Sequence, residues 1–193
     1  MNWKKIISLI FLFIIFFINI NLFAQPLAFG KEKFLGNVFG FSGVPMKFDD
    51  YWNQITPENN TKWGSVESLR DYYNWSRVDE IYNYAKQRGY PFKFHTLVWG
   101  QQYPNWITTL SLEEQREEVE EWIRLVGERY PDIDMVDVVN EPLPNHAPAP
   151  YKDALGGSGK TGWDWVIQAF EWVASLFSII INFIDSTPII IIT

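Results

Sequence analysis

Three clusters of polar side chains each follow a short apolar segment, and their residue types suit the recognition of sugars. The clusters are Glu58, Asn59 and Lys62, then His95, Trp99 and Gln102, then Asn140 and Glu141. Sugars present hydroxyl groups around rings whose C–H faces are apolar. A sugar pocket therefore needs bidentate amides, a lysine, a carboxylate and an indole for stacking. Together the three clusters predict a carbohydrate site.

Glu141 is the candidate for catalysis because of the segment that precedes it. Residues 135–139 are mostly branched and apolar, which is typical of a parallel strand buried on both faces. In parallel barrels the carboxyl ends of the strands carry the chemistry, and Glu141 lies just beyond such an end. Asp137 lies inside the strand, and we expect its side chain to face away from the site. The alternative for Glu141 is an ordinary solvated loop glutamate.

Other residues also have simpler interpretations. His95 alone could be a hydrogen-bonded core histidine, and Glu58 and Lys62 could form a surface pair four residues apart on a helical turn. The two histidines of the chain lie far apart, and neither HExxH nor CxxC spacing occurs. The sequence therefore predicts neither a metal nor a cofactor.

Composition limits the possible partners. The chain has 193 residues, no cysteine, and 16 Lys+Arg against 23 Asp+Glu, for a net charge of -7. We expect at most one domain without disulfides, and an acidic surface that disfavours nucleic acid and anionic membranes. The ten tryptophans and nine tyrosines fill a core or line a groove for flat ligands.

Residues 1–24 resemble a secretory signal peptide. Lys4 and Lys5 precede an apolar run from Ile6 to Ile20, and Ala24 offers a small residue for cleavage before Gln25. An uncleaved anchor is the alternative, although the run is shorter than the ~20 residues that a spanning helix needs. We expect a secreted or periplasmic protein with no stable membrane association after cleavage.

Strands and helices alternate along the rest of the chain. Strands are predicted at 34–41, 54–56, 91–99 and 135–140, a short helix at 46–52, and longer helices that begin near Ser76, Ser111 and Trp163. Ser76 with Asp79 and Ser111 with Glu114 fit N-terminal caps, and Gly89 fits a helix end. The helix from Trp163 is expected to end near Phe177, and a fifth strand to begin at 179–182.

Alternation without hairpin signals predicts α/β architecture with a parallel sheet. A doubly wound sheet would need a phosphate-binding glycine loop after an early strand, and the cluster Gly156–Gly159 follows a long proline-containing loop instead. Polar strand ends favour the (β/α)8 TIM-barrel type. A complete barrel needs ~250 residues, so we expect an incomplete one with about four to five βα units. Residues 25–177 are its N-terminal part, and 178–193 are an aberrant isoleucine-rich tail that would aggregate if exposed.

Three motifs in order resemble the signatures of family 10 glycoside hydrolases, the endo-β-1,4-xylanases. They are Thr56-Pro57-Glu58-Asn59 with Lys62-Trp63, then His95-Thr96-Leu97-Val98-Trp99 with Gln102 and Pro104-Asn105-Trp106, then Asp137-Val138-Val139-Asn140-Glu141-Pro142. The similarity extends from about Phe34 to Phe177 and includes the helix start at Gly162-Trp163-Asp164-Trp165.

The resemblance implies retaining hydrolysis of xylan by two carboxylates, without a metal or cofactor. Glu141 matches the general acid/base, and Asn140 matches the residue that binds the sugar 2-hydroxyl beside the nucleophile. The other members of the three clusters match positions that hold sugars on the non-reducing side of the cut; they are Glu58, Asn59, Lys62, His95, Trp99 and Gln102.

Two features depart from the family pattern. A second histidine often follows the motif tryptophan, whereas this chain has Gly100-Gln101, so contacts on that side of the groove are expected to differ. The nucleophilic glutamate of the family lies on the seventh strand, which this chain does not reach. We therefore expect the chain to be inactive as written. The alternatives are a non-catalytic fragment that binds xylan or xylo-oligosaccharides, and a half-barrel that assembles with a partner chain.

Overall fold

A parallel sheet in sequential strand order forms the centre of the structure. The computed structural model describes residues 3, 25–40, 45, 47–144, 146–157, 163–181 and 189–191. The strands are β1 (Gly36–Phe39), β2 (Gln54–Pro57), β3 (Lys93–Val98), β4 (Met135–Val139) and β5 (Ile189–Ile191). β1 pairs with β2, β3 with β4 and β4 with β5, and a bridge between Ile55 and Phe92 joins the two groups. The order is therefore β1-β2-β3-β4-β5, with every pairing parallel.

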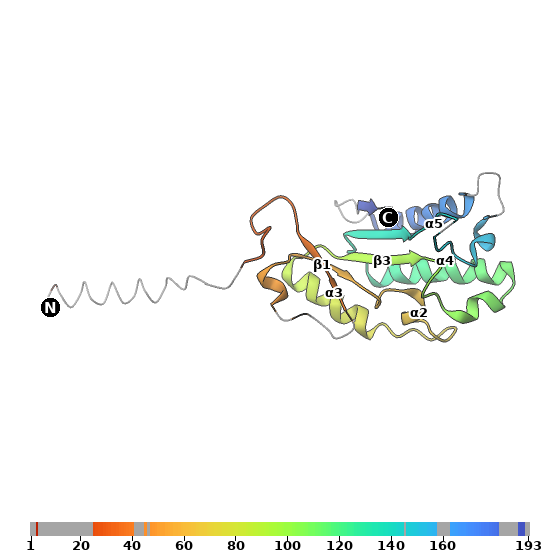
Figure 1. Cartoon of the computed structure of the whole chain (residues 1–193), viewed down its shortest axis with the longest axis horizontal. Helices are drawn as coiled ribbons and strands as arrows, with labels where there is room; N and C mark the ends of the chain where they lie inside the picture. The colour runs from red at the N-terminus through yellow and green to blue at the C-terminus, as the bar shows by residue number, and fades with distance from the viewer. Residues whose placement is uncertain are drawn as a thin grey trace.

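Helices connect the successive strands (Figure 1). The helices are α2 (Trp63–Val66), α3 (Ser76–Arg88), α4 (Leu112–Arg129) and α5 (Asp164–Ile181), with the 3-10 turns η1 (Phe48–Asp50), η2 (Asn105–Thr109) and η3 (Lys152–Leu155). This arrangement is the wall of a (β/α)8 barrel, as predicted, and the described residues do not close it. No helix among the described residues has the length and apolar character needed to cross a membrane.

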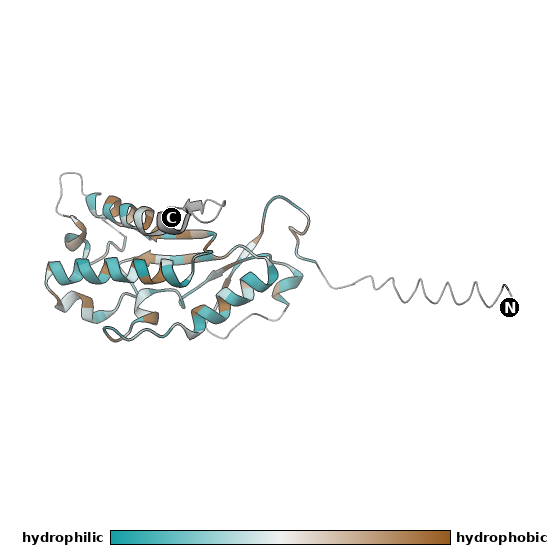
Figure 2. Cartoon of the chain, turned by 180° about the vertical axis from the view of Figure 1, so that it is seen from behind, coloured by the Kyte–Doolittle hydropathy of each residue, from teal (hydrophilic) through white to brown (hydrophobic). Residues whose placement is uncertain are grey.

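Local sequence signals account for α4. Ser111 Oγ accepts from the Glu114 N–H, and Glu114 reaches back to the Ser111 N–H at 3.1 Å, so the predicted capping box is confirmed. The buried face carries the predicted apolar stripe, which comprises Val119, Trp122, Ile123 and Val126. Where the helix surfaces face outward, they are mostly hydrophilic (Figure 2).

The two ends of α3 differ in how well local signals predicted them. Gly89 ends the helix at φ 65°, as expected. The prediction that Ser76 is the N-cap was wrong, because Trp75 occupies that place and Ser76 is the first helical residue. The indole of Trp75 stacks on Trp122 with 5.5 Å between ring centroids, and the side chain of Asn74 accepts from the Ser76 N–H at 3.3 Å. Asp79 accepts a hydrogen bond from Tyr130 instead of completing a cap.

The predicted fifth strand was also misplaced. Residues 179–181 end α5, and β5 lies further on, at Ile189–Ile191; Asn182 falls outside the described residues. A short run of isoleucines suits a helix or a strand equally well, so periodicity could not separate the two. Pairing of Ile189 with Met135 places the later isoleucines beside β4.

An aromatic stack joins the connecting segments to β3. Tyr73, Trp75, Trp122 and Trp63 stack in that order, with interplanar angles of 9°, 5° and 11°. The Trp122 indole N–H donates to the Leu97 carbonyl at 3.0 Å. Leu97 is the last but one residue of β3. Many of the aromatic residues therefore form core, and this core supports the end of β3 at which the polar clusters begin.

Candidate active site

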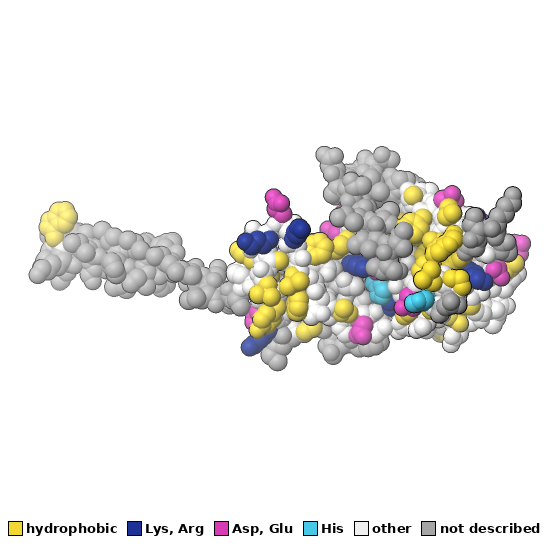
Figure 3. Space-filling view, turned by 45° about the horizontal axis from the view of Figure 1, so that its top comes forward, with side chains coloured by type: hydrophobic (Ala, Val, Ile, Leu, Met, Phe, Trp, Pro, Cys, Tyr) yellow, Lys and Arg dark blue, Asp and Glu magenta, His cyan; other side chains and the backbone are white. Residues whose placement is uncertain are grey.

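The predicted strand-end residues gather at one edge of the sheet because parallel strands end at the same side. Glu58 and Asn59 follow β2, Trp99 follows β3, and Asn140 and Glu141 follow β4. A cavity of about 460 Å³ lies beside these ends, and Glu58, Lys93, His95, Asp137 and Asn140 are among its lining residues. Figure 3 shows a face of the molecule on which histidine, acidic and basic side chains lie near a group of hydrophobic ones.

Trp99 joins two charged groups of the site. Its indole N–H donates to Glu141 Oε2 at 3.0 Å, and Lys62 Nζ lies 4.5 Å from the centroid of its ring. Glu141 has φ 50°, a left-handed conformation that costs energy for a residue with a side chain. The carboxylate is therefore held by a specific contact at a strained turn, which is unlike the solvated loop glutamate of the simpler interpretation.

Lys62 is a buried lysine beside three carboxylates. Only 3% of the residue is exposed, so the interpretation of Lys62 as part of a surface pair was wrong. Burial lowers the pKa of its ammonium group to about 8, and the charges of Asp137, Glu141 and Glu58 oppose that shift. Lys62 therefore places a positive charge next to Glu141 and Trp99. This charge is lost as the pH rises through about 8.

The expectation that Asp137 faces away from the site was wrong. Its carboxylate accepts from Lys93 Nζ at 2.8 Å, contacts His95 Nδ1 at 2.7 Å, and lines the cavity. In the register of β3 and β4, His95 lies directly opposite Asp137, so both side chains project from the same face of the sheet. His95 is thus hydrogen-bonded, as the simpler interpretation held, and it also lines the cavity.

Asp137 remains charged although it is fully buried. Burial by itself would raise the pKa of the Asp137 carboxyl, but hydrogen bonds from His95 and Lys93 outweigh it and lower that pKa. The second oxygen, Oδ1, has no hydrogen-bond partner among the described atoms. Because the side chain is 0% exposed, a substrate carbon cannot reach it, and Asp137 is not a nucleophile.

The remaining predicted residues lie at the same edge, in the cavity or beside it. Gln102 Nε2 donates to Asn59 Oδ1 at 2.8 Å, which ties the exit of β2 to the segment after β3. Asn140 is 7% exposed, and its N–H donates to the Val98 carbonyl at 2.9 Å. Glu58 is exposed at the mouth of the cavity. All eight predicted residues therefore belong to one edge, some in the cavity and others on its rim.

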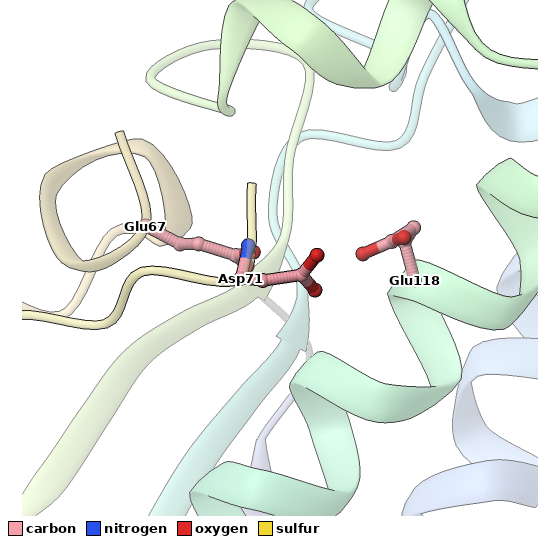
Figure 4. A group of neighbouring side chains, drawn as sticks. All are labelled: Glu67, Asp71 and Glu118. Atoms are coloured by element: carbon pink, nitrogen blue, oxygen red, sulfur yellow. The ribbon is translucent and has the colours of Figure 1, made fainter. Parts of the chain in front are cut away.

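A separate group of acids lies between α2 and α4. Glu67, Asp71 and Glu118 bring carboxylate oxygens within 4.8 Å of one another (Figure 4). Glu67 accepts from the Trp63 indole N–H at 2.7 Å and from the Asp71 N–H at 2.9 Å, and Glu118 accepts from Arg70 Nε at 2.7 Å. Burial raises the pKa of both Glu67 and Glu118. Their hydrogen bonds fasten the loop after α2 to α4.

Sequence reasoning missed Lys93 and misjudged Asp137, although a signal was present. A carboxylate inside an otherwise apolar buried strand requires a partner, since a charge is almost never fully buried alone. Lys93 and His95 are two residues apart on β3, so their side chains lie on the same face of the sheet. The partner of Asp137 could have been sought on that face of the neighbouring strand.

The sequence of this chain is similar to one family of known proteins. The sequence model described as glycosyl hydrolase family 10 matches residues 28–178. Endo-1,4-beta-xylanase B of Cellvibrio japonicus is 48% identical over 140 residues, which are 72% of this chain and 22% of that protein.

Solved structures share the fold. A family 10 glycoside hydrolase from Paenibacillus barcinonensis has a TM-score of 0.68 at 20% identity, covering 81% of this chain and 51% of that one. Xylanase 10B of Thermotoga petrophila, solved with xylobiose, has a TM-score of 0.61 at 24% identity, covering 74% and 46%. The chain thus spans about half the length of these solved structures.

Loss of the Asp137 charge should destabilise the protein strongly. We expect Asp137→Asn to lower the free energy of unfolding by about 3–5 kcal/mol, because it leaves the Lys93 ammonium without its buried partner. Asp134→Asn is the control, since the Lys86–Asp134 pair has similar geometry at 2.7 Å but is more exposed, and should cost about 1 kcal/mol or less. Urea unfolding at pH 7 measures the free energy of unfolding of both variants. Equal losses in the two variants would contradict the description of Asp137 as part of a buried ion pair.

Lys62 should titrate far below an exposed lysine. In the unfolded chain the Lys62 ammonium has the ordinary lysine pKa of 10.5, whereas in the folded chain its pKa is about 8. The unfolded state binds more protons between these values, so this group raises the free energy of unfolding as pH increases through that window. The Cε signal of ¹³C-labelled lysine, identified by its loss in Lys62→Met, should show the low midpoint. A midpoint near about 10.4, as in water, would contradict it.

Proposed function

Because the chain belongs to glycosyl hydrolase family 10, we propose that it carries the general acid/base half of a retaining endo-1,4-β-xylanase site. One observation carries this proposal: Glu141 follows β4 at the cavity edge, and the Trp99 indole N–H holds its carboxylate at 3.0 Å. The xylanase B relationship at 48% identity supports xylan as the substrate class.

In the proposed reaction Glu141 protonates the glycosidic oxygen as the bond to the sugar breaks. It then removes a proton from the water that releases the sugar from the enzyme. The Trp99 indole N–H directs one carboxylate oxygen, which leaves the other oxygen of Glu141 available for the substrate. Asn140, next to it, donates to the sugar 2-hydroxyl.

The remaining cluster residues are proposed to hold sugars. Lys62 supplies a desolvated cation beside Glu141, and Trp99 supplies the flat ring. His95 lines the cavity and Asp137 engages its Nδ1, so the orientation of the ring is fixed. Glu58, Asn59 and Gln102 offer further hydrogen bonds at the mouth. The xylobiose complex of the Thermotoga petrophila xylanase supports short xylo-oligosaccharides as ligands.

Hydrolysis with retention of configuration at the sugar carbon requires a second carboxylate ~5 Å from the first. Asp137 is too buried to serve, and the resemblance assigns the nucleophile to a seventh strand, beyond the five strands among the described residues. The second candidate function is therefore binding of xylo-oligosaccharides without hydrolysis, which needs only the cluster residues.

Export is a further part of the proposal. The lysines Lys4 and Lys5 and the apolar run 6–20 support a signal peptide at residues 1–24. This segment is outside the described residues except for Trp3. In a bacterial host, N-terminal sequencing of the exported protein should begin at Gln25. A mature chain that still starts at Met1 would contradict cleavage.

Glu141 should be indispensable in a complete barrel. We would replace the matching segment of the Cellvibrio japonicus xylanase B by residues 34–177 of this chain. In this chimera Glu141→Gln should lower kcat/KM for xylan by about 10²- to 10⁴-fold, because protonation of the leaving oxygen is lost. Glu113→Gln, an exposed carboxylate on α4, is the control and should leave activity unchanged.

Aryl xylobiosides distinguish acid catalysis from a general loss of structure. Formation of the glycosyl-enzyme from a dinitrophenyl xylobioside needs no proton, so Glu141→Gln should slow that step far less than it slows xylan hydrolysis. Equal losses on both substrates would count against the acid role.

The 193-residue chain by itself should release no reducing sugar from xylan, and robust release that disappears in Glu141→Gln would overturn the proposed need for a second carboxylate elsewhere.

A further inference from the structure

One peptide group beside the site is held from both sides by residues that follow Glu141 in the chain. The carbonyl of Trp99 accepts from the Tyr151 hydroxyl at 3.2 Å, and the N–H of Gly100 donates to the Ala147 carbonyl at 2.9 Å. These two groups belong to the same peptide bond. The segment that begins at Glu141 therefore returns to fasten the main chain of Trp99.

The contact requires glycine at position 100. A Cβ atom there would lie 2.2 Å from the Ala147 carbonyl oxygen and 2.4 Å from that of Pro148. Both atoms are backbone, so they cannot move aside as a flexible side chain could. Any larger side chain at position 100 would therefore displace residues 147–148 from the place that they occupy here.

Tyr151 is firmly held in its place. The residue is 1% exposed, and its ring packs edge-on against Trp63 with 5.6 Å between centroids. Burial raises the pKa of the Tyr151 hydroxyl, which therefore stays protonated and able to donate. Tyr151 also lines a hollow of about 10 Å³ together with Lys62, Trp99 and Tyr103. Its hydroxyl thus supports the main chain of Trp99.

The same tryptophan contacts Glu141 through its side chain. With its main chain fastened, the Trp99 indole presents its N–H to Glu141 Oε2 and its ring to Lys62. Glu141 itself sits at φ 50°, a conformation that persists only when neighbouring contacts define it.

We propose that Gly100 and Tyr151 are positioning residues that act through Trp99 to fix the carboxylate of Glu141. This inference rests on the proposed catalytic role of Glu141, and the contacts that it describes can be tested without a sugar ligand. Residues 147–151 are then a structural support of the acid/base, supplied by the same connection that carries it.

The Trp99 indole N–H reports on this geometry directly. In ¹⁵N-tryptophan-labelled protein at pH 7 its signal is identified by its loss in Trp99→Phe, and its shift should change in Glu141→Gln, which removes the charged acceptor. In Tyr151→Phe, which removes one oxygen atom, we expect the shift difference caused by Glu141→Gln to fall at least about twofold, as loss of a hydrogen bond loosens the indole. Gly100→Ala should have the same effect by displacing residues 147–148.

Tyr130→Phe is the matched control. Tyr130 is 1% exposed and its hydroxyl donates to Asp79 at 2.8 Å, between α3 and α4 and away from Glu141. This variant loses a buried hydrogen bond of the same kind, so it should lower the melting temperature while leaving intact the shift difference of Trp99 that Glu141→Gln causes. Retention of the full shift difference in both Tyr151→Phe and Gly100→Ala, or an equal reduction in Tyr130→Phe, would overturn the proposal.

Xylotriose titration separates this inference from the proposed function. Weaker binding by about fivefold in Tyr151→Phe, with none in Tyr130→Phe, would support both. Absence of xylotriose binding in the unmodified chain together with a reduced Trp99 shift difference in Tyr151→Phe would reject sugar binding by this chain and support the positioning role.

Discussion

The parallel register between β3 and β4 is the constraint on which the site depends. It sets His95 opposite Asp137 and Val98 opposite Val139, with an irregularity between these pairs. The same register brings the strand ends together, so that Trp99 reaches Glu141. A slip of one residue would turn every side chain of β4 to the other face. The ion pair, the cavity and the contact between Trp99 and Glu141 would then all be lost together.

Buried charge is the main energetic cost of this arrangement. Asp137 is fully buried and is satisfied on one oxygen by Lys93 and His95. Lys62 is also buried, and desolvation lowers its pKa despite the three neighbouring carboxylates. Burial of ions disfavours folding unless they pair well, so such groups are seldom kept for stability alone. Under the proposed function, ligand recognition is a reason to keep them, because a desolvated cation and a fixed imidazole can bind sugar hydroxyls selectively.

The aromatic core connects folding to the site. The stack of Tyr73, Trp75, Trp122 and Trp63 joins the helices and loops outside the sheet, and Trp122 donates to Leu97 at the end of β3. Trp63 also packs against Tyr151, which holds the peptide after Trp99. Packing therefore extends without interruption from α3 and α4 to the residue that contacts Glu141. Under the proposed function, the position of the acid/base depends on core residues that never touch substrate.

The sequence by itself determined the features that depend on neighbouring residues. Strand-helix alternation, the Ser111–Glu114 cap, the Gly89 helix end and the strand-end position of Glu141 follow from local patterns, because capping and periodicity act within a few residues. The three motifs also indicated the family and the eight site residues that the structure places at one edge. Their assignment to catalysis and sugar binding remains a proposal.

Tertiary structure alone decided which partners distant residues meet. Asp137 faces the cavity because β3 supplies Lys93 and His95 in register, and no local pattern encodes that pairing. Trp75, just before α3, stacks on Trp122, and residues 189–191 pair with β4 as β5. Gly100 is required by the backbone of residues 147–148, more than forty positions later in the chain. Contacts between segments far apart in sequence depend on the whole fold, and for that reason the sequence alone left them undetermined.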